Sequence, residues 1–371
     1  MRKFVFITIA ILLAVTTAGV AGGYQKLKSM LRPGPNADGQ GITLPVGWRI
    51  TPAGHPLPLP GDMAMKIVVS PDGKHAFVNT AGWHDHSVNA IDLASEKIVS
   101  TINVGKDWTG MALNPKTSEL FVSGGGPLTP QFAGLAKQRG VSDDAVNALK
   151  LPVLRLAFND TKLETKPSLP IDGLSDKDRF VSGVTYGPNS VAEGGALYIV
   201  NTQNDTVYRL SGAGFKTQVS AKVAYRPYTA ALAPDGKILA VSNWGDESVS
   251  LLDPATLKEN AKLKVGSHPN DLAYSKDGRL FVANAGSNSI SVIRDGKVIE
   301  TIRTSFEPKA LVGSTPVALA ITNDGRRLYV ANADNNDIAM IDIGNPRESE
   351  VLGFIPTGWY PTALAVSPDG K

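Results

Sequence analysis

The sequence predicts an all-β protein, a seven-bladed β-propeller whose blades are four-stranded antiparallel sheets. Three observations predict this fold: a recurring turn motif, an apolar strand after each copy of it, and a composition rich in turn-forming residues. The 371 residues include 37 Gly and 25 Pro, and 42% are hydrophobic against 19% charged. Such a mixture favours short strands joined by turns over long helices.

The turn motif recurs with the spacing of propeller blades. Its interval averages about 45 residues once one insertion of roughly 27 residues is set aside. Asp-Gly between two apolar runs predicts a tight hairpin, because glycine accepts the positive φ that such turns need. The five clear copies centre on Asp72-Gly73, Asp235-Gly236, Asp277-Gly278, Asp324-Gly325 and Asp369-Gly370.

Each period also contains enough strands for a complete blade. An apolar strand follows the turn, as at 280–284, and a third strand follows a short polar loop, as at 289–293. A fourth strand closes the unit, as at 98–105. Four strands per period without an intervening helix predict blades rather than βαβ units. We expect successive blades to pack through apolar residues such as Val241, Val282 and Val330.

The N-terminus reads as a targeting segment. Residues 1–21 are predicted to be a signal peptide, because a basic start precedes an apolar run that ends in small residues. Residues 22–41 then form a flexible leader, and residues 42–371 form the propeller. The alternative is an uncleaved membrane anchor, since about 18 residues is the short end of what spans a bilayer. A cleaved signal peptide predicts a periplasmic or extracellular protein. An uncleaved segment predicts an exported protein anchored in the membrane at its N-terminus.

The chain is expected to be part of a longer protein. Its last Asp-Gly turn should open a second strand, yet Lys371 follows directly, so the C-terminal blade is predicted to be incomplete. A natural end at this point would leave an open sheet edge, which propellers avoid.

One long loop, about residues 127–150, is predicted to be a helical insertion. Ser142 with Asp143 and Asp144 is a good N-terminal cap for a helix over 145–150. Long loops are often functional. The insertion is therefore either a lid or partner-docking element, or a tolerated surface insertion.

The strand phrase Tyr329-Val330-Ala331-Asn332, echoed at 281–284 and 198–201, resembles the YVTN-repeat (YncE-like) β-propeller family. The stretches 47–54 and 355–362 more specifically resemble the N-terminal propeller half of bacterial proteins in which an alkaline-phosphatase-like phosphoesterase domain follows. The resemblance covers about residues 42–371. It implies a recognition module whose phosphoesterase domain would follow in the same chain.

Chain order inside a blade predicts which loops share a face. The Asp-Gly turns lie on one face, whereas the loops between strands two and three lie with the loops between blades on the other. Aromatic and histidine side chains concentrate on that second face, and a ring of them around a channel mouth predicts a ligand or partner site. Its candidate residues are Trp83, His84, His86, Trp108, Tyr228, Trp244, His268, Trp359 and Tyr360. The alternative is that these rings only fill blade junctions.

The run Trp83-His84-Asp85-His86 could ligate zinc or copper through two imidazoles and a carboxylate. It supplies at most three ligands, however, and a solvated polar loop explains it equally well. The chain has no cysteine, which excludes disulfides, thiolate metal sites and a cysteine nucleophile. We therefore predict no metal and no cofactor.

No catalytic motif is present: the sequence lacks a Gly-x-Ser-x-Gly elbow, a Walker loop and a His-Glu-x-x-His zinc motif. We predict no catalytic residues and a non-catalytic role in recognition or scaffolding, with an unidentified protein or polymer as partner. The alternative is a propeller enzyme, a lactonase or a metal-dependent oxidoreductase, with its site at the channel mouth. A second alternative is binding of single-stranded DNA, which the net charge of only +3 disfavours.

Overall fold

The computed structural model describes residues 34–35, 41–43, 49–83, 86–127, 134, 138, 151–188, 195–212, 214–307, 310–367 and 370. The chain divides into two compact units, one of Met1–Pro56 with Ile355–Trp359 and one of Leu57–Phe354 with Tyr360–Lys371. The predicted signal peptide (1–21), most of the leader (22–41) and most of the insertion (127–150) lie outside the described residues. Within the described part of the chain, no helix is long and apolar enough to cross a membrane.

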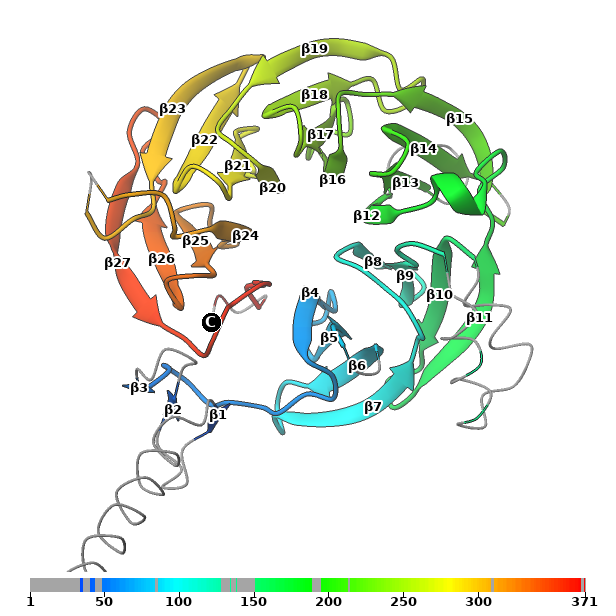
Figure 1. Cartoon of the computed structure of the whole chain (residues 1–371), viewed down its shortest axis with the longest axis horizontal. Helices are drawn as coiled ribbons and strands as arrows, with labels where there is room; N and C mark the ends of the chain where they lie inside the picture. The colour runs from blue at the N-terminus through cyan, green and yellow to red at the C-terminus, as the bar shows by residue number, and fades with distance from the viewer. Residues whose placement is uncertain are drawn as a thin grey trace, which may run out of the picture. The chain divides into compact units, whose positions relative to one another are not determined.

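The larger unit holds six four-stranded antiparallel sheets that stand as blades around a central axis (Figure 1). We number them blade 1 to blade 6 in chain order. Blade 1 holds β4 (Met63–Val69), β5 (His75–Ala81), β6 (Ser87–Asp92) and β7 (Lys97–Asn103), and blade 2 holds β8 (Met111–Asn114), β9 (Glu119–Ser123), β10 (Val153–Phe158) and β11 (Leu163–Leu169). Blade 3 holds β12 (Val181–Gly187), β13 (Ala196–Asn201), β14 (Thr206–Ser211) and β15 (Lys216–Lys222), and blade 4 holds β16 (Pro227–Leu232), β17 (Leu239–Asn243), β18 (Ser248–Leu252) and β19 (Glu259–Lys264). Blade 5 holds β20 (Pro269–Tyr274), β21 (Leu280–Asn284), β22 (Ser289–Arg294) and β23 (Lys297–Arg303), and blade 6 holds β24 (Pro316–Ile321), β25 (Arg327–Asn332), β26 (Asp337–Asp342) and β27 (Glu350–Pro356).

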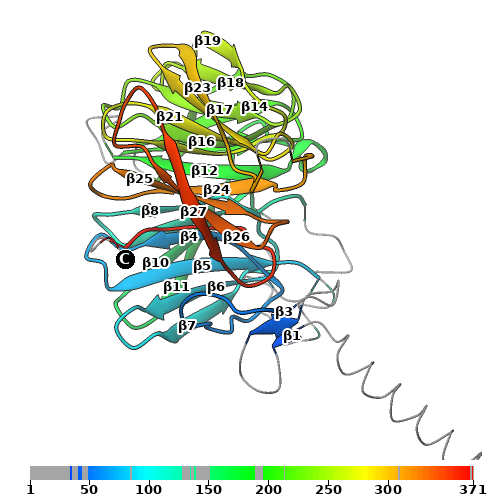
Figure 2. The same ribbon diagram turned by 90° about the vertical axis from the view of Figure 1, so that its left-hand side faces the viewer.

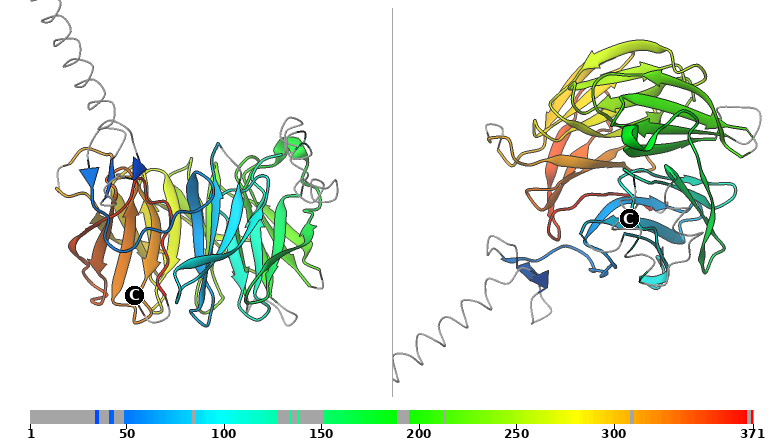
Figure 3. Two further views of the ribbon diagram at one scale, coloured as in Figure 1. Left: turned by 90° about the horizontal axis from the view of Figure 1, so that it is seen from below. Right: turned by 45° about the vertical axis from the view of Figure 1, so that its right-hand side comes forward.

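The predicted fold class is confirmed: every blade pairs its four strands in chain order. The strands of each blade run between two faces that carry the loops, as the side views show (Figures 2 and 3). A 3₁₀ turn, η1 (Asp176–Asp178), lies between blades 2 and 3. The smaller unit contains a three-stranded sheet of β1 (Gly34–Pro35), β2 (Ile42–Thr43) and β3 (Arg49–Ile50).

The segment of the larger unit that follows residue 359 lies between blade 6 and blade 1 (Figure 1). Thr362 Oγ1 donates a hydrogen bond to the Ala64 carbonyl on β4. Asn323, which follows β24, donates from Nδ2 to the Ser367 carbonyl at 3.4 Å. Six complete blades and a single inner segment are therefore described in the larger unit.

The Asp-Gly turns have the predicted conformation. Gly73, Gly278 and Gly325 take φ values of 70°, 83° and 71°. The aspartate of the turn holds it closed, since Asp72 Oδ1 accepts from Ser70 Oγ at 2.6 Å and from the Lys74 backbone N–H at 3.1 Å. The same local pattern is therefore both the sequence signal and the reason that each hairpin forms.

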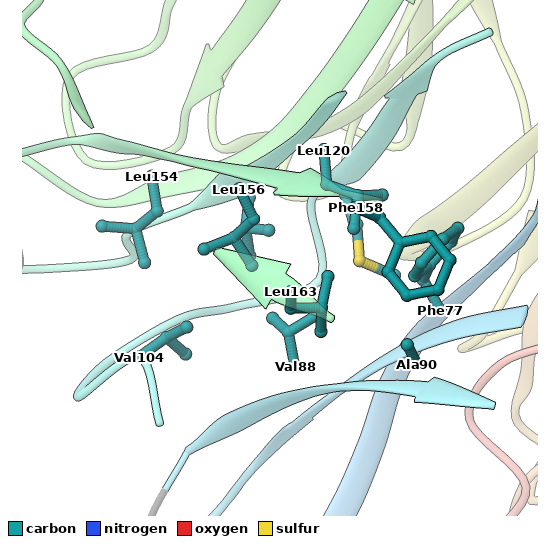
Figure 4. Packing of buried hydrophobic residues seen from close by; sticks show 11 residues of the cluster. Phe77, Val88, Ala90, Val104, Leu120, Leu154, Leu156, Phe158 and Leu163 are labelled. Carbon is teal, nitrogen blue, oxygen red and sulfur yellow. The ribbon is translucent and has the colours of Figure 1, made fainter. Parts of the chain in front are cut away.

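The core lies between neighbouring blades. Phe77 and Val88 of blade 1 face Leu120 and Leu156 of blade 2 (Figure 4). The expected interblade residues are fully buried, with 0% exposure for Val241, Val282 and Val330. Burial of each such side chain stabilises the fold by about 1.5–3 kcal/mol relative to an exposed one.

Candidate functional site

Most of the described residues that were predicted to form an aromatic face lie on loops, and Tyr228 on strand β16 is the exception. Trp83 and His86 precede β6, Trp108 lies between β7 and β8, and Trp244 and His268 flank β18 and β19. His84 lies outside the described residues. The other predicted members are Tyr228 on β16, Tyr360 in the larger unit, and Trp359 in the smaller unit.

The structure brings only some of these side chains together. The Trp244 and His268 rings stack with centroids 4.1 Å apart, and Trp108 meets Phe180 edge to face at 5.3 Å. Trp83 is 91% exposed, whereas Trp108, Tyr228 and Trp244 are half-buried. Burial raises the pKa of the Tyr228 hydroxyl, against an opposing hydrogen bond with Thr109.

His86 forms a buried pair with an aspartate that the sequence analysis did not single out. Its Nδ1 lies 2.7 Å from Asp107 Oδ1, and the Asp107 side chain is 0% exposed. The Asp107 backbone nitrogen also lies 3.0 Å from Nδ1. Burial raises the pKa of the Asp107 carboxyl, whereas its hydrogen bonds with His86 and Asn79 favour the ionised form. With Asp107 ionised, Nδ1–H donates to Asp107 Oδ1 and Nε2 is the nitrogen that gains or loses a proton.

The backbone of Gly82 can serve His86 Nε2 in both protonation states. The Gly82 N–H lies 3.4 Å from Nε2, and the Gly82 carbonyl oxygen lies 3.2 Å from it. A neutral ring can accept from the N–H, and a protonated ring can donate to the carbonyl. Gly82 takes φ +142°, and a Cβ there would come within 2.4 Å of the Asp62 carboxylate, so the position requires glycine.

The pKa of His86 is raised above its ordinary value. Burial of the ring lowers its pKa, but the hydrogen bond and the charge of Asp107, with a further hydrogen bond to Gly82, outweigh the burial. The carboxylate therefore stabilises the protonated imidazole and makes the neutral ring a stronger base.

Lys106 places a cation beside this pair. Its Nζ donates to the Pro127 carbonyl at 3.3 Å. Burial and the positive charge of Arg179 lower the pKa of the Lys106 ammonium group. Arg179 itself is 5% exposed and pairs with Asp176 at 3.3 Å. Positive charge therefore gathers at the loops between blades 1, 2 and 3.

A cavity of about 220 Å³ joins these groups. It is lined by Gly82, His86, Lys106, Asp107, Trp108, Gly125, Gly126 and Phe180. The glycine run at 124–126, which precedes the predicted 127–150 insertion, contributes Gly125 and Gly126 to this lining. A Cβ on Gly126 would come within 3.4 Å of Lys106 Nζ, so a side chain there would crowd the lysine.

The possible metal site at residues 83–86 includes His84 and Asp85, which lie outside the described residues. Its full set of ligands therefore stays a prediction. His86 turns its Nδ1 toward Asp107. In the part of the chain that the structure describes, no group of three or more His, Asp or Glu side chains is placed to hold a metal ion.

The comparison with known families bears on blades 3 to 6 and the segment that follows them. The sequence model of the lactonase family, seven-bladed β-propellers, matches residues 173–371, which is more than half of the chain. The chain belongs to this lactonase family. The matched residues include blades 3 to 6, and His86 and Asp107 lie outside them. The YVTN-repeat resemblance and the phosphoesterase domain stay predictions.

Solved structures share the fold at low sequence identity. Hydrazine synthase of Kuenenia stuttgartiensis is similar with a TM-score of 0.63 and 19% identity, over 83% of this chain and 90% of that one. A candidate 6-phosphogluconolactonase from Bacteroides fragilis gives 0.59 and 15%, over 81% and 85%. A catalytically inactive virginiamycin B lyase from Staphylococcus aureus with quinupristin gives 0.56 and 16%, over 81% and 88%. No curated protein sequence matches this chain.

These comparisons change the balance between the two leading functions. The expected non-catalytic role gains no support from the family match, whereas the alternative of a lactonase agrees with it.

Proposed function

We propose that this chain hydrolyses a small cyclic ester, a lactone, in the cavity between blades 1, 2 and 3. The observation that carries the proposal is the buried His86–Asp107 pair at 2.7 Å, which lines a cavity together with Lys106. An imidazole oriented by a buried carboxylate is a general base. The lactonase family match agrees with this chemistry.

The proposed reaction adds water to the ester carbonyl. His86 Nε2 takes a proton from a water molecule, and the hydroxide attacks the carbonyl carbon. The ester C–O bond of the ring then breaks, and the protonated imidazole returns its proton to the leaving alkoxide. The product is the open-chain hydroxy acid, so one lactone and one water give one molecule of product and His86 ends in its starting state.

Lys106 provides electrostatic stabilisation in the proposed reaction. Negative charge develops on the carbonyl oxygen during attack, and a cation in the same cavity stabilises it. The charge of Arg179 adds to the positive potential at this place. Asp107 supports the positive charge that forms on His86.

The size of the cavity limits the substrate. Most ligand sites for drug-sized molecules measure about 300–1,000 Å³, whereas this cavity measures about 220 Å³. Trp108 and Phe180 form its apolar side. We therefore propose a monocyclic lactone rather than a polymer. Export of the chain, which its N-terminal sequence predicts, would place the reaction outside the cytoplasm.

The proposal is tested by following acid release from lactones in a pH-stat. Purified protein is assayed against δ-gluconolactone, γ-butyrolactone and δ-valerolactone, with spontaneous hydrolysis subtracted. We expect hydrolysis of at least one of them, and His86→Ala should lower its kcat by about 10²–10⁴-fold, the range of general base catalysis. An equal rate in wild type and His86→Ala would overturn the assignment. Failure of folded wild type to hydrolyse any lactone would favour the non-catalytic role instead.

A further inference from the structure

Asn79, two residues before the end of β5, is a second side chain that holds the Asp107 carboxylate. Its Nδ2 donates to Asp107 Oδ2 at 2.8 Å and to the Trp108 carbonyl oxygen at 2.7 Å. Asn79 is 0% exposed. The two oxygens of the carboxylate therefore have different partners, His86 on Oδ1 and Asn79 on Oδ2.

The other blades do not need an asparagine at this place. Asn243 and Asn284 end strand two of blades 4 and 5 and pair with Ser248 and Ser289. In blade 1 the corresponding pair is Thr80 with Ser87. Asn79 therefore stands one residue earlier, where the other blades have small or apolar residues. These are Val200, Ser242, Ala283 and Ala331.

The shift by one residue decides which way the amide points. Successive side chains of a strand face opposite sides of a sheet. Asn284 donates within its own blade, to Ser289 Oγ at 3.2 Å and Ser291 Oγ at 3.0 Å. Asn79 instead donates to the loop that leads to the next blade, at two consecutive residues. In blades 4 and 5 the asparagine holds its own blade together, whereas in blade 1 Asn79 reaches the histidine–aspartate pair.

We propose that Asn79 is a positioning residue, which fixes the Asp107 carboxylate so that Oδ1 faces His86. Its role in catalysis rests on the proposed lactone hydrolysis, whereas its effect on the titration of His86 does not. One amide hydrogen holds Oδ2 and the other holds the Trp108 carbonyl, so both the carboxylate rotation and the loop position are set. The Oδ1 atom of Asn79 is buried without a partner among the described residues. The Oδ1 atoms of Asn243, Asn284 and Asn332 are buried in the same way, so the positioning role rests on the two hydrogen bonds that Asn79 Nδ2 donates.

The test measures the titration of His86 in the full chain by NMR of its imidazole. Asn79→Ala should move the midpoint toward lower pH by roughly half a unit or more, because a mobile carboxylate stabilises the protonated ring less. Asn284→Ala is the matched control, since it removes a buried repeat amide far from the pair and should leave the midpoint unchanged. Circular dichroism checks folding, and Asn79→Ser replaces Asn79→Ala if the latter does not fold.

Activity gives a second readout. With any lactone that the wild type hydrolyses, Asn79→Ala should lower kcat about tenfold and leave KM unchanged, the sign of an interaction used in the reaction rather than in binding. An unchanged His86 midpoint in a folded Asn79 variant would overturn the positioning role. A shifted midpoint without lactone hydrolysis in the wild type would uphold the positioning role and reject the proposed function.

Discussion

Two blade junctions build different chemistry from the same part of the fold. In each, the loop between strands two and three meets the loop that leads to the next blade. After blade 1 that contact is an ion pair, His86 with Asp107 at 2.7 Å. After blade 4 it is a ring stack, Trp244 on His268 at 4.1 Å. The repeat therefore fixes where the loops come into contact, and the loop residues decide which interaction forms there.

Burial separates the two junctions further. The His86 and Asp107 side chains are 9% and 0% exposed, whereas Trp244 and His268 are half-buried. A charge in water gains little from a partner, but a buried charge depends on it. The first junction can therefore tune a titrating group, and the second presents ring surface toward solvent.

The largest expected difference between the junctions is in stability. Asp107→Ala should lower the free energy of unfolding by about 3 kcal/mol, because it leaves His86 and Asn79 buried without their acceptor. His268→Ala removes only one face of a half-buried stack and should cost about 1 kcal/mol. Urea unfolding of both variants measures the difference. Equal losses would show that burial does not distinguish the two sites.

A second difference concerns pH. The folded-state pKa of His86 is raised above its ordinary value of 6.5. Protonation of His86 therefore favours the folded state: its stabilisation is complete below pH 6.5 and is lost as the pH rises through the folded pKa. The general base acts in its neutral form, so kcat should rise as the pH increases through the folded-state pKa of His86.

Unfolding of wild type and His86→Gln across pH 5.5 to 9, roughly one unit below the ordinary pKa and two and a half above it, checks this. The stability advantage of the wild type should be largest at the acid end and should shrink with rising pH. An advantage that grows with pH would contradict the raised pKa.

The fold was more predictable than the site for a physical reason. The Asp-Gly turns of blades 1, 4, 5 and 6 and buried residues such as Val282 are local signals that recur along the chain. The contact between His86 and Asp107 joins residues 21 positions apart, and it exists only after two loops have been folded against each other. The sequence analysis therefore named His86 as a candidate ligand-binding residue of the aromatic face, in a loop that could be solvated or bind a metal, and it passed over Asp107.

A signal for the missed residues was present in the repeat itself. The loops before blades 5 and 6 read Val-Gly-Ser-x-Pro, at 265–269 and 312–316, whereas the loop before blade 2 reads Val-Gly-Lys-Asp-Trp at 104–108. Departures from a structural repeat mark positions that the fold alone does not require. Asn79 departs from its repeat in the same way. The direction of the His86 ring could not be read from either departure.

The smallest expected effect is at the ring stack itself. Trp244→Ala removes one partner of the stack with His268 and should lower the free energy of unfolding by about 1 kcal/mol. It should leave lactone hydrolysis unchanged, because Trp244 does not line the cavity that holds His86. Trp83→Ala is the matched control: Trp83 is 91% exposed, so its loss should leave stability unchanged.

Trp244→Ala also separates the two possible roles of the aromatic face, packing and substrate binding. If Trp244 belongs only to the packing of the junction after blade 4, its loss changes stability and neither kcat nor KM. If the predicted aromatic face binds the substrate, the same variant raises KM while kcat stays the same. A contact that is equally strong in the ground state and in the transition state affects only KM. A raised KM in Trp244→Ala with an unchanged KM in Trp83→Ala would extend the binding site beyond the cavity and join the two junctions in one function.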